Sequence, residues 1–261
     1  MQSRSIKSIF KESFWMAIDS IRKNKLRSSL TLLGISIGVF SVIGVMTAIR
    51  TLESSVESGL NVFATNTFVI QKYPAISFGN ERRKHRNRKN IDYSQYEKLK
   101  SRAQLPILVS VSERSYVRDV KYKDRTVKNS IELIGGDEGT VRCYNTYIAD
   151  GRNFINEDIH HIRNVCILGM DVVDRLFPFE DPLGKRIHIE GLDYMVIGLT
   201  ERQGELFGES KDNFIAIPIT TYLKRFSERW TTLSIDVESK SELNYEKTKD
   251  EVIGLMRSIR K

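Results

Sequence analysis

The sequence has few of the residues from which metal sites and disulfide scaffolds are built. It contains two cysteines, Cys143 and Cys166, and four histidines among 261 residues. Two cysteines are too few for a disulfide scaffold and lack metal-ligand spacing, so we expect two buried thiols, with a single bridge between them as the alternative. His160 and His161 are adjacent and would point to different faces of any regular element, which argues against a zinc site.

Catalytic signatures are also missing from the sequence. It has no HExxH zinc motif, no nucleophile elbow and no dinucleotide-binding glycine pattern. Its one Gly-Lys pair, Gly184-Lys185, is followed by Arg186 and lacks the upstream glycine of a phosphate-binding loop. We interpret this pair as a turn before a strand, and we expect no ATPase site in this chain.

One polar cluster, formed by Glu157, Asp158, His160 and His161, has the residue types needed for acid–base chemistry. No nucleophile is paired with an oriented base beside it. Asn156 is instead a candidate helix cap, with the two acids favouring the first turn of a short helix. We therefore predict no catalytic, cofactor or metal site, and no enzyme.

The charge balance is basic, with 41 Lys and Arg against 33 Asp and Glu and a net charge of +8. The basic residues gather near the start and in residues 82–89, not among aromatic residues that would stack on bases. No motif for reading nucleic acid is present, so we predict no nucleic-acid partner.

A single stretch, Leu30–Ile49, carries no charge over about twenty residues, enough to span the roughly 30 Å hydrocarbon core of a bilayer. A secretory signal peptide is the alternative. The apolar run is too long for one, begins about thirty residues into the chain and lacks a small-residue cleavage site. The sequence therefore predicts a transmembrane helix over residues 28–50.

The charges that flank this segment predict its orientation. The turns after it hold Arg50 beside Glu53 and Glu57, whereas the residues before it are rich in Lys and Arg. This bias predicts a cytoplasmic amino terminus and a main domain outside the inner membrane. The basic residues before the segment are Arg4, Lys7, Lys11, Arg22, Lys23, Lys25 and Arg27.

Small residues gather on one face of the predicted transmembrane helix. At about 100° per residue, Gly34, Gly38, Ser41 and Ala48 lie on one side, where they would let another helix approach closely. Gly34 and Gly38 match the GxxxG pattern, but glycine is common in membrane helices. A packed helix is our prediction, and a plain lipid anchor is the alternative.

Residues 1–27 predict a basic amphipathic helix whose apolar stripe includes Phe10, Phe14 and Ile18. Such a helix would lie in the membrane interface. Packing on a soluble partner would use the same stripe, and the neighbouring membrane segment favours the interface.

Two amphipathic stripes flank the main domain. Leu52, Val56 and Leu60 recur at helical spacing in residues 51–66, and Val252 and Leu255 do so in residues 241–261. We predict two stalk helices that pair in antiparallel fashion and couple the membrane to the outer domain.

Residues 67–240 predict a mixed α+β domain of two subdomains, because runs with strand alternation are interspersed with helical ones. Asp92 is a candidate N-cap for the first helix. The predicted strands lie within 108–120, 126–134, 187–197 and 233–237, and the predicted helices within 92–102, 170–177 and 219–226. The predicted turns are Gly135-Gly136, Asp150-Gly151, residues 181–184 and Glu190-Gly191.

A further loop, residues 204–208, carries Leu206 and Phe207 between two glycines. Its apolar tip would contact a dimer mate or partner protein, or else fold back on its own core.

Four segments follow one another in the second half of the chain: GRNFINED at 151–158, VCILG at 165–169, RLFPFEDPLGKRIHIEG at 175–191 and YMVIGLTERQG at 194–204. Together they resemble the periplasmic core domain of MacB-like ABC transporter permeases. RKNKLRSSLTLLGISIGV at 22–39 resembles the entry of that family into its first membrane helix.

The resemblance implies the amino-terminal part of an inner-membrane permease that has four spans and works as a homodimer or heterodimer. It implies an ABC ATPase subunit as a separate partner and allows a periplasmic adaptor protein. This chain stops before the remaining spans of that pattern. The alternatives are a single-span receptor or scaffold that binds a ligand or regulates an envelope enzyme, and an anchored envelope enzyme.

Overall fold

The computed structural model describes residues 6–60, 66–73, 85, 87–128, 130–206 and 208–260. The chain divides into two compact units, Met1–Glu57 and Ser58–Lys261.

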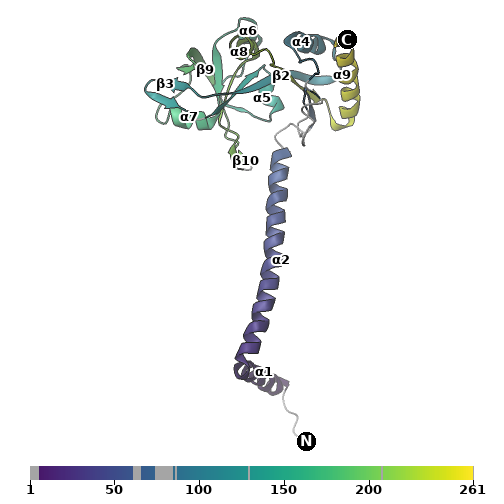
Figure 1. Cartoon of the computed structure of the whole chain (residues 1–261), viewed down its shortest axis with the longest axis vertical. Helices are drawn as coiled ribbons and strands as arrows, with labels where there is room; N and C mark the ends of the chain where they lie inside the picture. The colour runs from purple at the N-terminus through teal and green to yellow at the C-terminus, as the bar shows by residue number, and fades with distance from the viewer. Residues whose placement is uncertain are drawn as a thin grey trace. The chain divides into compact units, whose positions relative to one another are not determined.

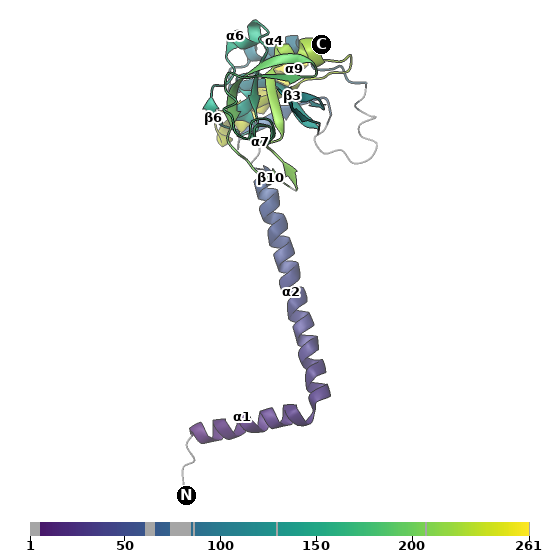
Figure 2. The same cartoon turned by 90° about the vertical axis from the view of Figure 1, so that its left-hand side faces the viewer.

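The first unit consists of two helices. Helix α1 covers Ile6–Lys23 and α2 begins at Lys25 and runs to Leu60. The chain bends sharply between them at Asn24 (Figures 1 and 2), whose backbone continues the hydrogen bonding by donating to Ser20 and accepting from Ser28. Within α2, Lys25–Thr51 is long and apolar enough to cross a membrane.

The second unit is built on one mixed sheet of eleven strands, in the order β1-β13-β2-β5-β12-β7-β9-β8-β3-β4, with β6 paired to β9. The pairs β5–β12 and β7–β9 are parallel and the others are antiparallel. The strands are β1 Thr67–Ile70, β2 Pro106–Val117, β3 Val120–Tyr122, β4 Arg125–Val127, β5 Ile131–Gly136, β6 Ile148–Gly151, β7 Val165–Leu168, β8 Arg186–Ile189, β9 Leu192–Thr200, β12 Phe214–Pro218 and β13 Ser234–Ser239. A separate hairpin joins β10 Glu205–Leu206 to β11 Glu209–Ser210.

Short helices cover parts of this sheet. The longest is α9, which packs against α4 beside the strands β1, β13 and β2. The helices are α4 Tyr93–Arg102, α5 Thr140–Cys143, α6 Asn156–His160, α7 Met170–Leu176, α8 Ile219–Phe226, the 3₁₀ helix η1 Glu242–Asn244 and α9 Tyr245–Ile259.

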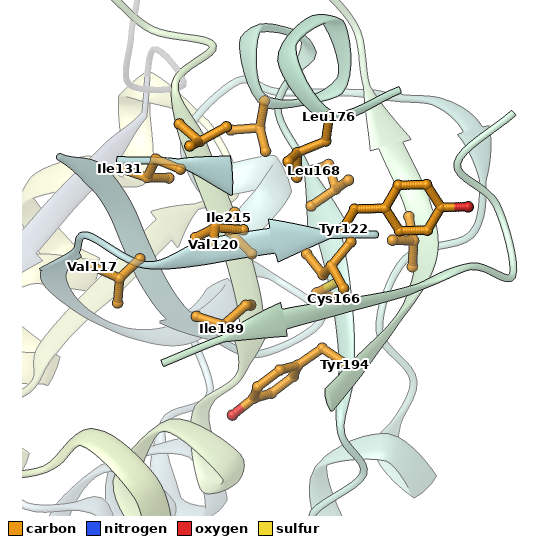
Figure 3. Packing of buried hydrophobic residues seen from close by; sticks show 14 of the residues in the cluster. Val117, Val120, Tyr122, Ile131, Cys166, Leu168, Leu176, Ile189, Tyr194 and Ile215 are labelled. Carbon is orange, nitrogen blue, oxygen red and sulfur yellow. The ribbon is translucent and has the colours of Figure 1, made fainter. Parts of the chain in front are cut away.

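The buried hydrophobic residues form three clusters along the sheet. The largest joins strands β3, β5, β7 and β12 to α7 and α8, and Figure 3 shows Ile131, Leu168, Leu176 and Ile215 converging within it. A second lies between β2, β13, α4 and α9. The third is small and lies on the opposite face of β5, β7 and β12 from the first, because side chains alternate along a strand.

The predicted α+β class is confirmed, and so are several predicted elements. The helices α4, α7 and α8 lie within the predicted ranges, and Asp92 caps α4 by accepting the N–H of Gln95 at 2.9 Å. The run 187–197 forms the hairpin β8–β9 around the predicted turn Glu190-Gly191. The runs 108–120 and 126–134 each contain parts of two strands, because the chain turns inside them.

Three local predictions are wrong. Asp150-Gly151 is not a turn but the end of β6, where it pairs with Leu199 and Gly198 of β9. Gly135-Gly136 is not a turn; it forms the end of β5 and pairs with Ile217 and Pro218 of β12. Asn156 is not a helix cap but the first residue of α6. The capping position is Ile155, whose backbone N–H is satisfied by the Asp158 carboxylate three residues later.

Candidate functional site

The predicted packing face of the membrane helix lies on α2. The side chains of residues 30–51 are exposed within the structure, and a Cβ placed on Gly34 or Gly38 meets no atom within 4 Å. Ser41 and Ala48 lie on the same helix. The role of these residues in packing against a second helix stays a prediction.

The predicted stalk residues lie on two helices. Leu52, Val56 and Leu60 belong to the last turns of α2, where only the backbone is described. On α9, Val252 is fully buried in the cluster with α4, and Leu255 packs against the same cluster. These two residues thus contribute to the core of the second unit, and their pairing with α2 stays a prediction.

A buried carboxylate lies where β5 ends. Asp137 accepts hydrogen bonds from the Tyr96 hydroxyl at 2.5 Å, from the Gly139 N–H at 3.0 Å and from the Ser110 hydroxyl. Burial raises the pKa of Asp137, and the hydrogen bonds from Ser110 and Tyr96 offset part of that rise. The group joins α4, β2 and α5 in one network.

A second buried carboxylate, Asp236, lies on β13, which pairs with β2. It accepts a hydrogen bond from Ser112 at 2.9 Å, and the Ser112 hydroxyl lies 3.2 Å from that of Tyr144. Burial raises the pKa of Asp236 to about 6. The Arg114 guanidinium stacks over the Tyr144 ring at 4.3 Å and pairs with Glu132 at 2.8 Å.

The polar cluster around α6 has a structural role in the fold. Asp158 is fully buried and pairs with Arg152 at 2.6 Å and Arg163 at 3.2 Å. Burial raises its pKa, but the hydrogen bonds from Arg152 and the Ile155 N–H outweigh that effect and hold the pKa below its usual value. Glu157, His160 and His161 are exposed and do not join this clamp. The cluster ties loop 152–163 together.

Neither cysteine forms a disulfide. Cys143 and Cys166 are free, both are buried, and burial raises the pKa of each thiol. The expectation of two buried thiols is confirmed. Among the described residues, no group of His, Cys, Asp and Glu has the geometry of a metal site.

A cavity of about 390 Å³ opens on the sheet face that carries the third cluster. Its floor includes Ile134, Ile167 and Ala216, which are neighbours across β5, β12 and β7. Residues of α5, Gln203 and residues 209–211 of the β10–β11 hairpin region line its sides. Phe207 of the predicted apolar loop lies outside the described residues. The hollow combines an apolar floor with polar residues around it.

Comparison with known proteins identifies the family. A family model described as the MacB-like periplasmic core domain matches residues 28–255, from the first turn of α2 to the last turns of α9. The chain belongs to the MacB-like periplasmic core domain family.

Curated relatives of this MacB-like chain are macrolide export ATP-binding/permease proteins. The protein from Yersinia pestis is 27% identical over 246 residues, which cover 94% of this chain and 35% of that protein. The protein from Campylobacter fetus is 28% identical over 255 residues, covering 97% of this chain and 38% of that protein. The MacB-like chain thus spans little more than a third of the length of these relatives.

Solved structures share the fold. The periplasmic region of MacB from Actinobacillus actinomycetemcomitans superimposes with a TM-score of 0.63 at 20% identity, covering 77% of this chain and 87% of that one. The extracellular domain of the transporter YknZ from Gram-positive bacteria gives a TM-score of 0.57 at 19% identity, covering 74% and 93%.

Sequence analysis of the MacB-like chain missed the buried carboxylates Asp137 and Asp236. The sequence carried no signal for Asp236, because in Leu233–Val237 it shares the polar phase of the alternation with Ser234, as a solvent-facing strand residue would. Its partner Ser112 lies 124 residues away, so the sequence could not have named it.

Proposed function

We propose that this chain is the amino-terminal part of an ABC transporter permease, with α2 as its first membrane helix and residues 58–261 as its extracytoplasmic domain. The observation that carries the proposal is the single family match that extends from α2 through the outer domain. The names of the curated relatives, which join ATP binding to a permease, support a transport role. In this proposal, an ATPase unit drives motions of α2 that the outer domain converts into cargo movement.

The proposal places the amino terminus in the cytoplasm and the outer domain outside the membrane. The basic residues before α2 support this orientation. Ser20 on α1 and Ser101 on α4 are exposed, and both native cysteines are buried, so each serine can be replaced by a uniquely accessible cysteine.

In intact spheroplasts, a membrane-impermeant maleimide is expected to label Ser101→Cys and not Ser20→Cys, and lysis should expose both. The parent chain, with only its buried thiols, is the control. Labelling of Ser20→Cys alone before lysis would show the opposite orientation. Labelling of both variants before lysis would refute a membrane-spanning α2.

The proposal also assigns coupling to the small face of α2, because Gly34 and Gly38 are spaced four apart on one face, which allows close approach of another helix. Gly34→Leu together with Gly38→Leu should abolish ATP hydrolysis that depends on the assembled permease and ATPase in nanodiscs. Val39→Leu, on the opposite side of α2, is the matched control. Unchanged hydrolysis in the double variant would reject the packing role, and a scaffold without transport would show no such hydrolysis in the parent.

A further inference from the structure

The cavity beside α5 is a consequence of strand register and of incomplete helix cover. Arg114 on β2 faces Ile134 on β5, Ile134 faces Ala216 on β12, and Ala216 faces Ile167 on β7. These four residues form one row across four strands, and since paired residues share a face, all four line the cavity. The next row, Tyr116, Glu132 and Phe214, lines it as well.

The two faces of these strands are covered unequally. On the first face, α7 and α8 bury Leu133, Ile215 and Leu168 completely. On the cavity face, α5 is only four residues long and lies against β13 and β2. Within the described chain, the apolar residues of β5, β12 and β7 on this face are covered only by Val141 of α5 and by the side chains of Ile148, Phe154 and Phe214, and the hollow lies beside them.

The lining of the cavity is amphipathic and aromatic. Ile134, Phe154, Ile167 and Ala216 are buried apolar residues of the floor, while the exposed ring of Tyr116 stands at the mouth. Flat aromatic side chains around an apolar floor favour a ligand with an aromatic body. A volume of about 390 Å³ lies within the roughly 300–1,000 Å³ typical of small-molecule sites.

Several polar groups of the lining have partners within the protein, whereas the Lys211 ammonium has none in the part of the chain that the structure describes. Gln203 donates to Thr146 at 2.6 Å, Thr200 donates to Leu168, and Arg114 pairs with Glu132. Lys211 is half-buried, and its ammonium group makes no hydrogen bond or ion pair among the described residues. Glu209 lines the same hairpin wall but is exposed to solvent.

We propose that this cavity binds a small amphipathic anion, with its aromatic body on the floor formed by Ile134, Ile167 and Ala216 and its negative group on the Lys211 ammonium. Partial burial of the lysine strengthens a charge-assisted hydrogen bond relative to one in open water. Arg114 also lines the cavity, where its charge is paired with Glu132. The inference concerns the outer domain alone and does not depend on a role in transport.

The test uses the full chain in nanodiscs, with 1-naphthoate as the probe and its neutral analogue 1-naphthamide as the comparison. Isothermal titration calorimetry is corrected with empty nanodiscs, since both probes partition into lipid. The parent chain should bind naphthoate with one site and bind naphthamide more weakly. Equal binding of both probes would overturn the role of Lys211, and no binding of either would overturn the site.

Two variants separate the contribution of the apolar floor to binding from that of the Lys211 ammonium. Ala216→Leu fills the floor and should abolish binding of both probes, whereas Lys211→Met should weaken naphthoate binding by about fivefold and leave naphthamide binding unchanged. Lys240→Met, at an exposed position beyond β13, is the matched control and should change neither. If Ala216→Leu fails to fold, Lys211→Met still decides: an unchanged preference for naphthoate in that variant would refute the proposal.

Discussion

The hydroxyl of Tyr96 on α4 donates a 2.5 Å hydrogen bond to Oδ2 of Asp137, 41 residues further along the chain. Both residues are buried, so the bond closes the junction between α4 and the end of β5. A carboxylate at such a position is tolerated only because its oxygens are occupied.

Loss of this bond is expected to destabilise the second unit. Tyr96→Phe leaves one oxygen of a buried carboxylate without its donor, which should lower the free energy of unfolding by about 1–3 kcal/mol. Urea unfolding followed by circular dichroism measures the change. Tyr93→Phe is the matched control on the same helix, because the Tyr93 hydroxyl makes no hydrogen bond within the described chain, and it should cost much less. Equal losses in the two variants would show that the bond to Asp137 contributes nothing.

Removal of a basic partner of Asp158 should lower the free energy of unfolding more than removal of one partner of a surface ion pair. Arg152→Ala removes the 2.6 Å partner of a buried carboxylate that keeps Arg163 and the Ile155 N–H, and it should cost about 1–3 kcal/mol. Lys249→Ala breaks the exposed pair with Glu246 and should cost less than about 1 kcal/mol. The comparison is made by urea unfolding of both variants beside the parent. A cost for Arg152→Ala as small as that for Lys249→Ala would argue that water replaces the arginine.

The raised pKa of Asp236 predicts a pH dependence of stability. Its pKa is about 6 in the folded chain and roughly 3.9 in the unfolded chain, so between these values the folded state binds more protons. For this group, stability is greatest below about pH 4, falls as the pH rises to about 6 and is constant above that. Glu113, whose pKa burial raises to about 7, acts in the same direction.

Asp236→Asn isolates this contribution from those of other groups. From pH 4 to pH 7, the free energy of unfolding of the variant should rise relative to that of the parent by about 2–3 kcal/mol. Asp250→Asn, at an exposed position on α9, should show no such trend. A constant difference between Asp236→Asn and the parent across this range would contradict the raised pKa.

Two glycine substitutions should have opposite effects. A Cβ on Gly135 would lie 2.5 Å from Cγ of the Tyr222 ring, whereas a Cβ on Gly254 of α9 meets nothing within 4 Å. Gly135→Ala should therefore destabilise by about 1–3 kcal/mol through overpacking. Gly254→Ala should stabilise by up to about 1 kcal/mol because alanine favours the helix. Thermal unfolding compares the two, and a stable Gly135→Ala would mean that α8 can shift away from β5.

Local patterns in the sequence were sufficient to predict the helices that depend on residues close together in the chain. Absence of charge over Leu30–Ile49 predicted the apolar part of α2, and Asp92 before a helical run predicted the start of α4, since an N-cap acts within three residues. The same patterns failed for Gly135-Gly136: two glycines usually mark a turn, but here Gly135 allows Tyr222 of α8 to pack against β5, and Gly136 lies against Thr140.

The sequence by itself therefore determined the apolar helix, the alternation of strands and helices and the resemblance to the MacB-like family. Only the tertiary structure decided which residues surround the buried charges and which residues line the cavity. Strand order places Ser112 beside Asp236 and brings Arg114, Ile134, Ala216 and Ile167 into one row, although these residues lie far apart along the chain. Such neighbours are fixed by long-range pairing in the sheet, and the period of side chains along a single strand carries no information about which strand lies next to it.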